Sequence, residues 1–388
     1  MSNYDGKIKK RFDDKSWHST HEQNHDFFEP LIILSAKIGY ILPSFLKKIF
    51  ISIIDILGLW ISRFSKIFIS PLYPKYLLTG NENHCAKKMC ILYKGPIGSL
   101  DVILTFFNIK YNTCQIEQLK KERKNKIKKM KKSESYSSFD FLIIRSDVFF
   151  QRYLKKKGFI IIPEYVSFQL DITSSLEDIL KRASPDICQD IEKAKRTKYE
   201  YEISDDLDTF RFFYDRMYVP FIKWKHKEKG RIVSFATICH LAARGAKLLI
   251  LTHNKQRIFG GIFLKENNIM RTYYAGLMIG KFNHIRNGIM ALSYYYMIKI
   301  SKKLDCKSID FGTAPPFIND GLYLYKKKWG MNIVETSPIF SDIFAINIPK
   351  RDHSRLKQFI DKNPVHYLND NRLKVLQNVD LKNETKID

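Results

Sequence analysis

A loop that leads into a helix is the part of the sequence best suited to hold an anion. Residues 276–280 and 283–288 are rich in Gly and Asn, and they precede a helical pattern at residues 287–303. The start of a helix presents unpaired backbone N–H groups and the positive end of the helix dipole, which together bind a pyrophosphate or a carboxylate. The candidate residues of this anion site are Gly280, Arg286, Asn287 and Gly288.

Two other motifs resemble a kinase triplet and a phosphate-binding loop, but neither is complete. Asp310-Phe311-Gly312 matches the magnesium-binding triplet of protein kinases, but the H-R-D-x-x-x-x-N loop and the V-A-I-K strand of kinases do not occur upstream of it. The turn at residues 94–99 joins a strand to a helix, but it lacks the order of glycines and lysine that places a P-loop on phosphates. Neither a kinase nor a P-loop enzyme is therefore indicated.

Hydrophobic periodicity predicts the elements that position the anion loop. The predicted elements of this region are strands at residues 248–252, 258–264, 270–275, 308–311 and 331–335 and helices at residues 287–303 and 321–329. The first three strands are separated by short polar turns, which indicates an antiparallel meander. Strands and helices also alternate from residue 88 onwards, so the predicted fold class is α/β or α+β.

This order of elements resembles the acyl-CoA N-acyltransferase (GNAT) fold, and more closely its FemAB-like branch, which includes the BioF2-like acyltransferase domains. The resemblance rests on the meander that feeds a loop and a helix, on the strand that ends at Gly312, and on residues 325–330 (YKKKWG). The last segment is similar to the aromatic-Lys-x-x-aromatic-Gly signature of that family. The resemblance covers about residues 88–348 and implies a GNAT-like mixed sheet, in tandem, whose central strands splay above the helix that starts near Asn287.

The resemblance also implies a function. It implies an acyltransferase that moves an acyl group from acyl-CoA, with acetyl-CoA as the expected donor, to an amine of a sugar, a peptide or a lipid-linked glycan precursor. The R/Q-x-x-G-x-G/A loop of ordinary GNAT enzymes is only approximated by Arg286, Asn287, Gly288 and Ala291. Aminoacyl-tRNA therefore stays open as the donor, and a basic module that binds nucleic acid or anionic lipid stays open as the alternative function.

Acyl transfer requires a group that takes the amine proton and a donor that stabilises the oxyanion. By the family signature Lys326 faces the site and steadies the oxyanion, although a run of lysines can equally be a solvated helix face. Asp310 either accepts the amine proton or caps the turn that follows it. Residues alternate across a strand, so either Tyr273 or Tyr274 faces inward, and Tyr274 is the candidate acid or a core residue. The resemblance also implies the residues that bind the acceptor, which are Tyr218, Trp224, His226 and Asp320.

An apolar segment at residues 31–78 follows a polar one at residues 1–30. Its longest apolar run, residues 49–61, contains Asp55 and is shorter than the roughly 20 residues of a membrane-spanning helix. Polar residues recur at helical spacing after Pro43, which predicts an amphipathic helix at residues 44–70. This helix either lies on an anionic membrane surface or packs on the protein's own core or a partner subunit.

Composition bounds the remaining possibilities. The 388 residues contain 66 Lys and Arg against 40 Asp and Glu, for a net charge of +26, and 45% are hydrophobic, which excludes a disordered or fibrous chain. The six cysteines show neither disulfide nor zinc-ribbon spacing. His18, His21 and His25 could line one helix face, but a polar tail explains them, so no metal is expected. Residues 1–30 lack the apolar core of a secretory signal, so we expect a cytoplasmic protein, peripheral on the inner face of the membrane if residues 44–70 bind lipid.

We expect five segments along the chain. They are a polar tail at residues 1–30, the amphipathic helical segment at 31–78, an N-terminal GNAT-like half at 79–204, a C-terminal GNAT acyltransferase domain at 205–348 and a polar tail at 349–388. Within the N-terminal half, residues 120–132 carry nine Lys and Arg and one Glu. Such a run is typical of a solvated loop, and contact with the phosphates of tRNA or anionic lipid is its functional alternative.

Overall fold

The computed structural model describes residues 33–34, 44–69, 73–82, 85–96, 99, 102–104, 115–119, 139–226, 232–334, 342–347, 361–369 and 372–376. The chain divides into two compact units. Unit 1 consists of Met1–Ser62, Phe168–Gly312 and Lys328–Asn332, and unit 2 of Arg63–Ser167, Thr313–Lys327 and Ile333–Asp388. Residues 1–30, with His18, His21 and His25, and residues 120–132 lie outside the described ranges.

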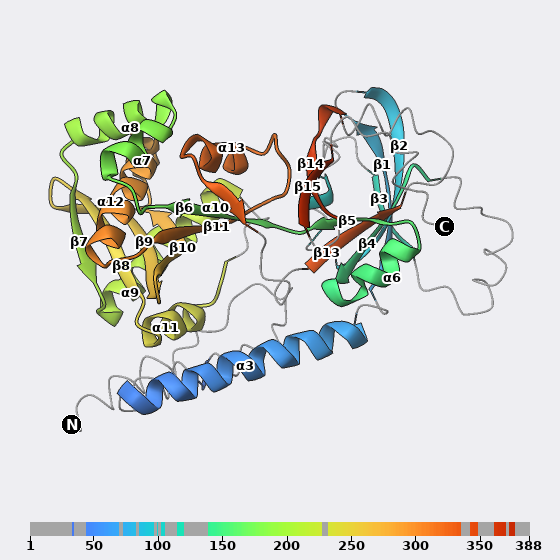
Figure 1. The fold of residues 1–388 in the computed structure, drawn as a ribbon, viewed down its shortest axis with the longest axis horizontal. Coiled ribbons are helices and arrows are strands. Elements are labelled where there is room, and N and C mark those ends of the chain that lie inside the picture. The colour runs from blue at the N-terminus through green and yellow to red at the C-terminus, as the bar shows by residue number, and fades with distance from the viewer. Residues whose placement is uncertain are drawn as a thin grey trace, which may run out of the picture. The chain divides into compact units, whose positions relative to one another are not determined.

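Unit 1 is built on a seven-stranded mixed sheet (Figure 1). In spatial order its strands are β12 (Asn332–Val334), β6 (Val166–Asp171), β11 (Ser308–Ala314), β10 (Ile269–Leu277), β9 (Gln256–Glu266), β8 (Lys247–His253) and β7 (Glu200–Ser204). Strands β7 to β10 are antiparallel, whereas β10 and β11 are parallel. The turn between β8 and β9 consists of Asn254 and Lys255, both with positive φ, as a two-residue hairpin requires. The predicted meander is confirmed.

Helices cover both faces of this sheet (Figure 1). One group is α9 (Leu207–Phe213), the π-helical turn η7 (Tyr214–Tyr218), α10 (Val219–His226) and α11 (Phe235–Ala243). The other group is α7 (Leu176–Arg182), α8 (Pro185–Arg196) and α12 (Ile289–Lys303). Helix α12 starts two residues after the start predicted from the sequence and ends at the predicted residue. Residues 248–251 of β8 are all buried, as expected for a strand that is covered on both faces.

Unit 2 is built on a six-stranded mixed sheet. In spatial order its strands are β3 (Gln115–Leu119), β1 (Lys75–Glu82), β2 (Cys85–Lys94), β4 (Phe141–Asp147), β13 (Asp342–Asn347) and β5 (Ile160–Pro163). The unit also contains η6 (Val148–Phe150), α6 (Gln151–Lys156), most of α13 (Gly321–Lys328) and the hairpin β14 (Val365–Asn369) and β15 (Arg372–Leu376). Val365, Tyr367 and Leu376 of this hairpin are buried in the core of unit 2.

The two sheets are assembled differently from the segments expected at residues 79–204 and 205–348. Strands β6 and β7 belong to the sheet of unit 1, and β13 pairs with β4 and β5 in unit 2. The segment expected as a polar tail at residues 349–388 contains the hairpin β14–β15. Strand pairing joins segments that are far apart in the sequence, so local composition did not indicate which sheet each strand belongs to. The apolar stretch of β14 is short and has polar and charged neighbours, so composition did not indicate the hairpin either.

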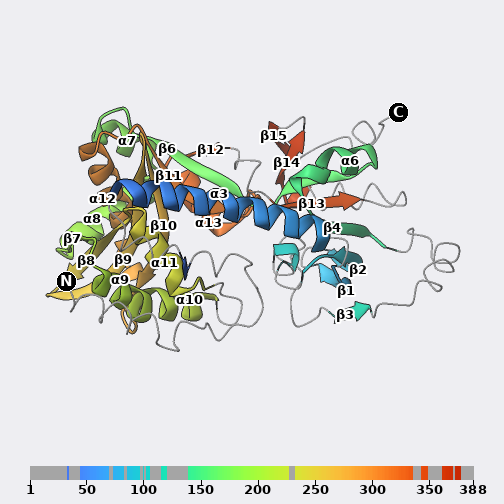
Figure 2. The same cartoon turned by 90° about the horizontal axis from the view of Figure 1, so that it is seen from below.

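The amphipathic helix predicted at residues 44–70 is α3 (Ser44–Ile69). In Figures 1 and 2 it lies beside α11, and the contact between Asp55 and His240 joins the two helices. Ile51 and Ile54 are buried, so one side of α3 packs on unit 1. Among the helices within the described ranges, none combines the length and the apolar character needed to cross a membrane.

Candidate functional site

The central feature of unit 1 is an opening between its two parallel strands. β10 and β11 pair over only three residues, from Ile269 with Ser308 to Arg271 with Asp310. Beyond this point β10 continues to Leu277 and stays paired with β9, while β11 continues to Ala314. The strands therefore splay, and within the described sheet the β11-facing side of residues 272–277 carries main-chain groups that are not part of a strand ladder.

Two local irregularities open the sheet at this point. The register of β10 against β9 shifts between Thr272 and Ala275, so that Tyr273 and Tyr274 form a β-bulge. In β11, Gly312 has a φ of 74°, a left-handed conformation that interrupts the strand and that glycine adopts without steric cost. The Thr272 hydroxyl donates to the Asp310 carbonyl at 3.3 Å, so a side chain ends the ladder between the two strands.

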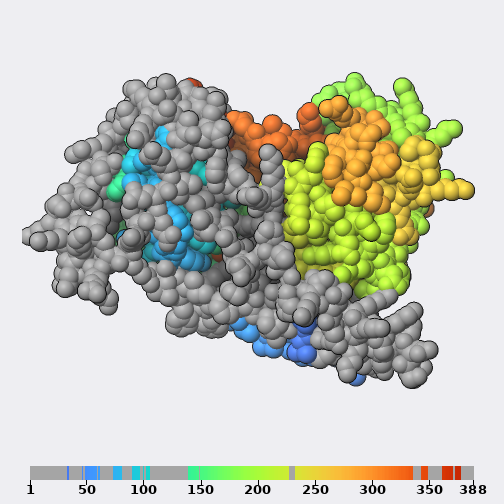
Figure 3. All heavy atoms as spheres, turned by 180° about the vertical axis from the view of Figure 1, so that it is seen from behind, coloured from blue at the N-terminus to red at the C-terminus, as the bar shows by residue number. Residues whose placement is uncertain are grey.

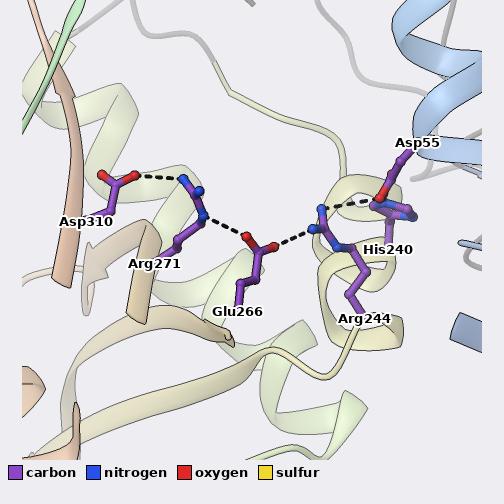
Figure 4. Close-up of polar contacts among 6 residues, drawn as sticks. All are labelled: Asp55, His240, Arg244, Glu266, Arg271 and Asp310. Carbon is purple, nitrogen blue, oxygen red and sulfur yellow. Dashed lines mark hydrogen bonds and ion pairs between the residues drawn. The ribbon is translucent and has the colours of Figure 1, made fainter. Parts of the chain in front are cut away.

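Asp310 lies where the strands separate. Its Oδ1 accepts a hydrogen bond from the Gly312 N–H, and its Oδ2 accepts one from Arg271 Nη1, both at 2.8 Å (Figure 4). Arg271 Nε also donates to Glu266 Oε2 at 2.7 Å. Both carboxylate oxygens are thus held by donors from its own strand and from β10. This geometry favours the capping role of Asp310 over the proton-accepting role.

The bulge brings aromatic side chains together. The ring of Tyr274 lies 5.5 Å from that of Tyr218, which is buried in η7 and accepts a hydrogen bond from the Val233 N–H at 3.3 Å. Burial raises the pKa of Tyr218. At Gly276 an added Cβ would lie 2.7 Å from the Met217 backbone, so η7 packs directly on β10. A π-helical turn of this kind often marks a functional position.

The expected alternation of Tyr273 and Tyr274 across the strand is wrong. Both side chains are half-buried, and both pack against the core formed by α9, η7 and α11. The bulge adds one residue to β10 and so interrupts the two-residue period on which the argument depended. Burial, together with Glu266, raises the pKa of Tyr273.

A buried Tyr–His pair holds the loop before α12. The Tyr199 hydroxyl bonds to Nδ1 of His284 and also to the side chain of Asn287. The ring of His253 lies 5.7 Å from that of His284. Burial raises the pKa of Tyr199 to about 12, and burial together with His253 lowers the pKa of His284. Asn287, a candidate anion-binding residue, is thus fixed by a neutral tyrosine.

Helix α12 starts directly after this loop. Gly288 is its N-cap residue, and no side chain caps its first turn. Gly288 has a φ of 77°, and an added Cβ would lie 2.0 Å from the carbonyl oxygen of Asp190 in α8, so glycine is required by close packing. Arg286 and Gly280 are exposed. The first turn of α12, which no side chain caps, is suited to the predicted anion site.

One acceptor candidate contacts the same loop. Trp224, which is half-exposed at the end of α10, stacks on Phe282 with 4.3 Å between ring centroids. Phe282 belongs to the 3-10 turn η9 (Phe282–Ile285) that precedes α12. His226 is exposed at the end of α10. The structure thus brings Trp224 together with the loop of the donor candidates.

The two remaining candidates, one directly before α13 and one within it, belong to unit 2. Asp320 Oδ1 accepts hydrogen bonds from the N–H groups of Leu322 and Tyr323, so Asp320 caps this helix. Lys326 is only 2% exposed, and its Nζ donates to the Thr313 carbonyl at 2.9 Å. The alternative of a solvated helix face is therefore wrong for Lys326.

Several polar residues of these regions were missed by the sequence analysis. They are Tyr199, Arg271, Glu266, Tyr323 and His366. Tyr323 and His366 form a buried pair in unit 2, with 2.9 Å between the hydroxyl and Nε2. Each such pair joins residues from separate elements. Of their members, only His284 lies in the loop that the sequence predicted to bind an anion. Within the ranges that the structure describes, no group of three or more His, Cys, Asp or Glu residues is arranged to hold a metal ion.

Comparisons with known proteins give structural neighbours only. No protein-family model matches the sequence, and no curated protein is significantly similar to it. The chain is similar to FemX, with 14% identity over 73% of this chain and 86% of that chain and a TM-score of 0.38. It is also similar to the C-terminal domain of a putative lysylphosphatidylglycerol synthetase from Agrobacterium fabrum, with 11% identity over 70% of this chain and 80% of that chain and a TM-score of 0.37. A third similar structure is a tandem GNAT protein from the clavulanic acid biosynthesis pathway, with 8% identity over 68% of this chain and 79% of that chain and a TM-score of 0.32.

The fold is GNAT-like. The antiparallel meander, the splay between β10 and β11 and the helix α12 that follows β10 are the features that the sequence predicted for this fold. Each unit has its own mixed sheet, and the amphipathic helix α3 is an N-terminal extension.

Proposed function

We propose that the chain is an acyltransferase that moves an acyl group from acyl-CoA to an amine and that holds the donor in the opening between β10 and β11. The observation that carries this proposal is the end of the parallel ladder at Arg271 and Asp310, beside a bulged β10. The amides of the pantetheine arm can pair with the edge of β10 beyond Arg271, where the ladder with β11 has ended, as an added strand does. The pyrophosphate of CoA suits the uncapped N-terminus of α12.

The reaction needs few side chains. The amine attacks the thioester carbonyl and the carbon–sulfur bond breaks. The proton that the amine nitrogen loses balances the one that the departing thiolate takes up. A main-chain N–H of the bulged part of β10 is the proposed oxyanion donor, because a bulge turns main-chain groups out of the regular strand geometry. Tyr274 is the proposed acid for the thiolate. Asp310 positions β11 through Gly312 and Arg271.

The acceptor that we propose is an amine on a sugar, a peptide or a lipid-linked glycan precursor. Trp224 is half-exposed and flat against Phe282, which is an arrangement on which a sugar ring can stack. Tyr218 and His226 lie on the same helical segment, formed by η7 and α10. Asp320 serves as the cap of α13.

Donor binding can be tested by thermal shift and isothermal titration of the full chain with acetyl-CoA, a longer acyl-CoA and CoA. A ligand that binds only the folded state raises the melting temperature. Asn287→Ala should weaken binding of acyl-CoA by about tenfold, because it removes a residue fixed at the anion loop. Asn283→Ala, at an exposed position in the same loop, is the matched control.

The same panel separates the two donors. If an aminoacyl-tRNA stabilises the chain and no acyl-CoA does, the donor is aminoacyl-tRNA and the acyl-CoA proposal is wrong. If neither raises the melting temperature and no amide forms with a panel of amino sugars and amines, the acyltransferase proposal is overturned.

A further inference from the structure

A continuous apolar stripe is exposed along α3. Its members recur at spacings of three and four residues, and their exposed fractions lie between 41% and 55%. They are Leu46, Ile49, Ile53, Ile56, Leu57, Trp60 and Ile61. At about 1.5 Å per residue the stripe is roughly 22 Å long. Large apolar side chains that gather in one exposed strip of this size mark an interaction surface.

This stripe is not the side by which α3 packs on unit 1. Among the α3 residues whose burial is described, Ile51, Ile54 and Gly58 are buried. On the packed side the Asp55 carboxylate contacts His240 Nε2 at 3.0 Å and Arg244 Nη1 at 3.6 Å. The helix therefore has two apolar faces, and the two roles considered from the sequence are both available to it.

A chain of ion pairs fixes the rotation of α3 about its axis (Figure 4). Arg244 pairs with Asp55 and, at 2.5 Å, with Glu266, which pairs in turn with Arg271. Because this chain and the buried isoleucines hold one side of the helix, the exposed stripe keeps pointing away from the packed side. Atoms of α3, in blue, reach the surface in the space-filling view of Figure 3.

The charges of α3 indicate which partner suits the stripe. The helix contains Lys47, Lys48, Arg63 and Lys66, and its one acidic residue, Asp55, forms an ion pair with Arg244 and a hydrogen bond with His240. Trp60 lies in the stripe, and tryptophan favours the boundary between lipid and water. A second copy of a chain with a net charge of +26 would bring like charges together.

We propose that α3 docks on an anionic lipid bilayer, lying in the interface with the stripe from Leu46 to Ile61 buried among the acyl chains. This surface is separate from the proposed donor site, and the inference does not depend on the acyltransferase proposal. Apolar burial and attraction of the flanking cations to lipid phosphates act together in such a helix.

The test is co-sedimentation of the full chain with vesicles of phosphatidylcholine and with vesicles that also contain phosphatidylglycerol. The chain should bind the anionic vesicles, and Ile53→Asp with Ile56→Asp should weaken binding at least about tenfold. The matched control is Ile203→Asp with Leu304→Asp, which changes the charge equally at two exposed apolar residues away from α3. The control should bind as the unchanged chain does.

Each variant is first checked for an unchanged melting temperature and sedimentation coefficient. Equal binding by the α3 variant and the control would overturn the proposal, as would equal binding of neutral and anionic vesicles. If the unchanged chain ignores both vesicles but forms a dimer that the α3 variant loses, the stripe binds a second copy and the bilayer proposal is wrong. If the α3 variant unfolds, Trp60→Ser replaces it, and the same outcomes decide.

Discussion

Each unit contains a parallel strand pair, and the two pairs end differently. In unit 1 the pair β10 and β11 separates after Arg271 and Asp310. In unit 2 the pair β2 and β4 is joined from Ile91 with Phe141 to Lys94 with Ile144, where β2 ends. The other edge of β4 is paired with β13 along its full length. The parallel pair of unit 1 therefore ends while both of its strands continue, whereas the pair of unit 2 ends where β2 itself ends.

The residues at the two centres explain the difference. In unit 1 a bulge at Tyr273 and Tyr274 and the left-handed Gly312 turn the strands apart. In unit 2 a buried Arg145 on β4 bonds to Glu164 and to Asp342 on β13, at 3.0 and 2.5 Å. This ion-pair group ties neighbouring strands together. Our proposal places the donor site in unit 1, and the ion-pair group of unit 2 stabilises its own sheet.

The largest expected effect concerns the ion-pair group around Arg145 in unit 2. Arg145→Met removes the cation between two buried carboxylates, so the free energy of unfolding should fall by about 3–5 kcal/mol. Denaturant unfolding measures this change. Acyl-CoA affinity of the molecules that remain folded should stay within a factor of about two, since the residue is not at the proposed site. A selective loss of donor affinity at unchanged stability would reverse the assignment of the two units.

Two left-handed glycines at the anion loop form a matched pair. Gly288→Ala should cost about 2–4 kcal/mol, because its Cβ meets the Asp190 carbonyl and its φ is 77°. It should also weaken acyl-CoA binding by moving the start of α12. Gly280→Ala should cost only about 1 kcal/mol, because its φ is 76° but its Cβ points into open space. Thermal unfolding of both variants, with and without acetyl-CoA, measures the contrast, and equal costs would contradict the packing.

Two lysines of α13 test whether this helix contributes to the chemistry. Lys326 is buried, whereas Lys328 is half-exposed and pairs with Asp186. If Lys326 steadies the oxyanion, Lys326→Met should raise the activation free energy by roughly 2–4 kcal/mol and so lower kcat, with little change in donor affinity. Lys328→Met should have a much smaller effect. A loss of melting temperature that accounts for all lost activity would make Lys326 a structural residue of unit 2.

The smallest effect concerns the two buried Tyr–His pairs. Burial lowers the pKa of His284 in unit 1 and of His366 in unit 2 below the usual 6.5. The unfolded chain then binds more protons than the folded one, so stability should fall as the pH drops below about 6.5. His284→Gln and His366→Gln should each flatten this slope in unfolding curves. Only His284→Gln should also change the pH dependence of donor binding, and an equal change from His366→Gln would contradict the comparison.

The sequence predicted best what depends on neighbouring residues. Helix α3, the meander and the start of α12 follow from hydrophobic spacing and turn residues, and their observed bounds are close to the predicted ones. The bulge in β10 has no comparable signal, because Tyr273 and Tyr274 fit a regular strand equally well. The pairing of β13 with β4 depends on contacts between distant segments, which periodicity does not record.

The candidate site was predicted only in part for the same reason. The loop before α12 and the end of β11 were found because glycine and strand-end signals are local. The ion-pair chain from Asp55 through Arg244 and Glu266 to Arg271 draws one residue from each of several elements (Figure 4). Lys326 carried a motif, but its burial and its bond to Thr313 depend on how the chain folds back.

Hydrogen–deuterium exchange of the full chain with and without acetyl-CoA tests the central claim most directly. The free chain should exchange the amides of residues 272–277 that face the opening, because they lie outside the described ladder with β11. Bound acetyl-CoA should protect these amides and those of residues 284–291, and it should leave β4 and β13 unchanged. Protection confined to unit 2, or binding of acetyl-CoA without protection of β10, would contradict the assignment of the donor site to the splay of unit 1.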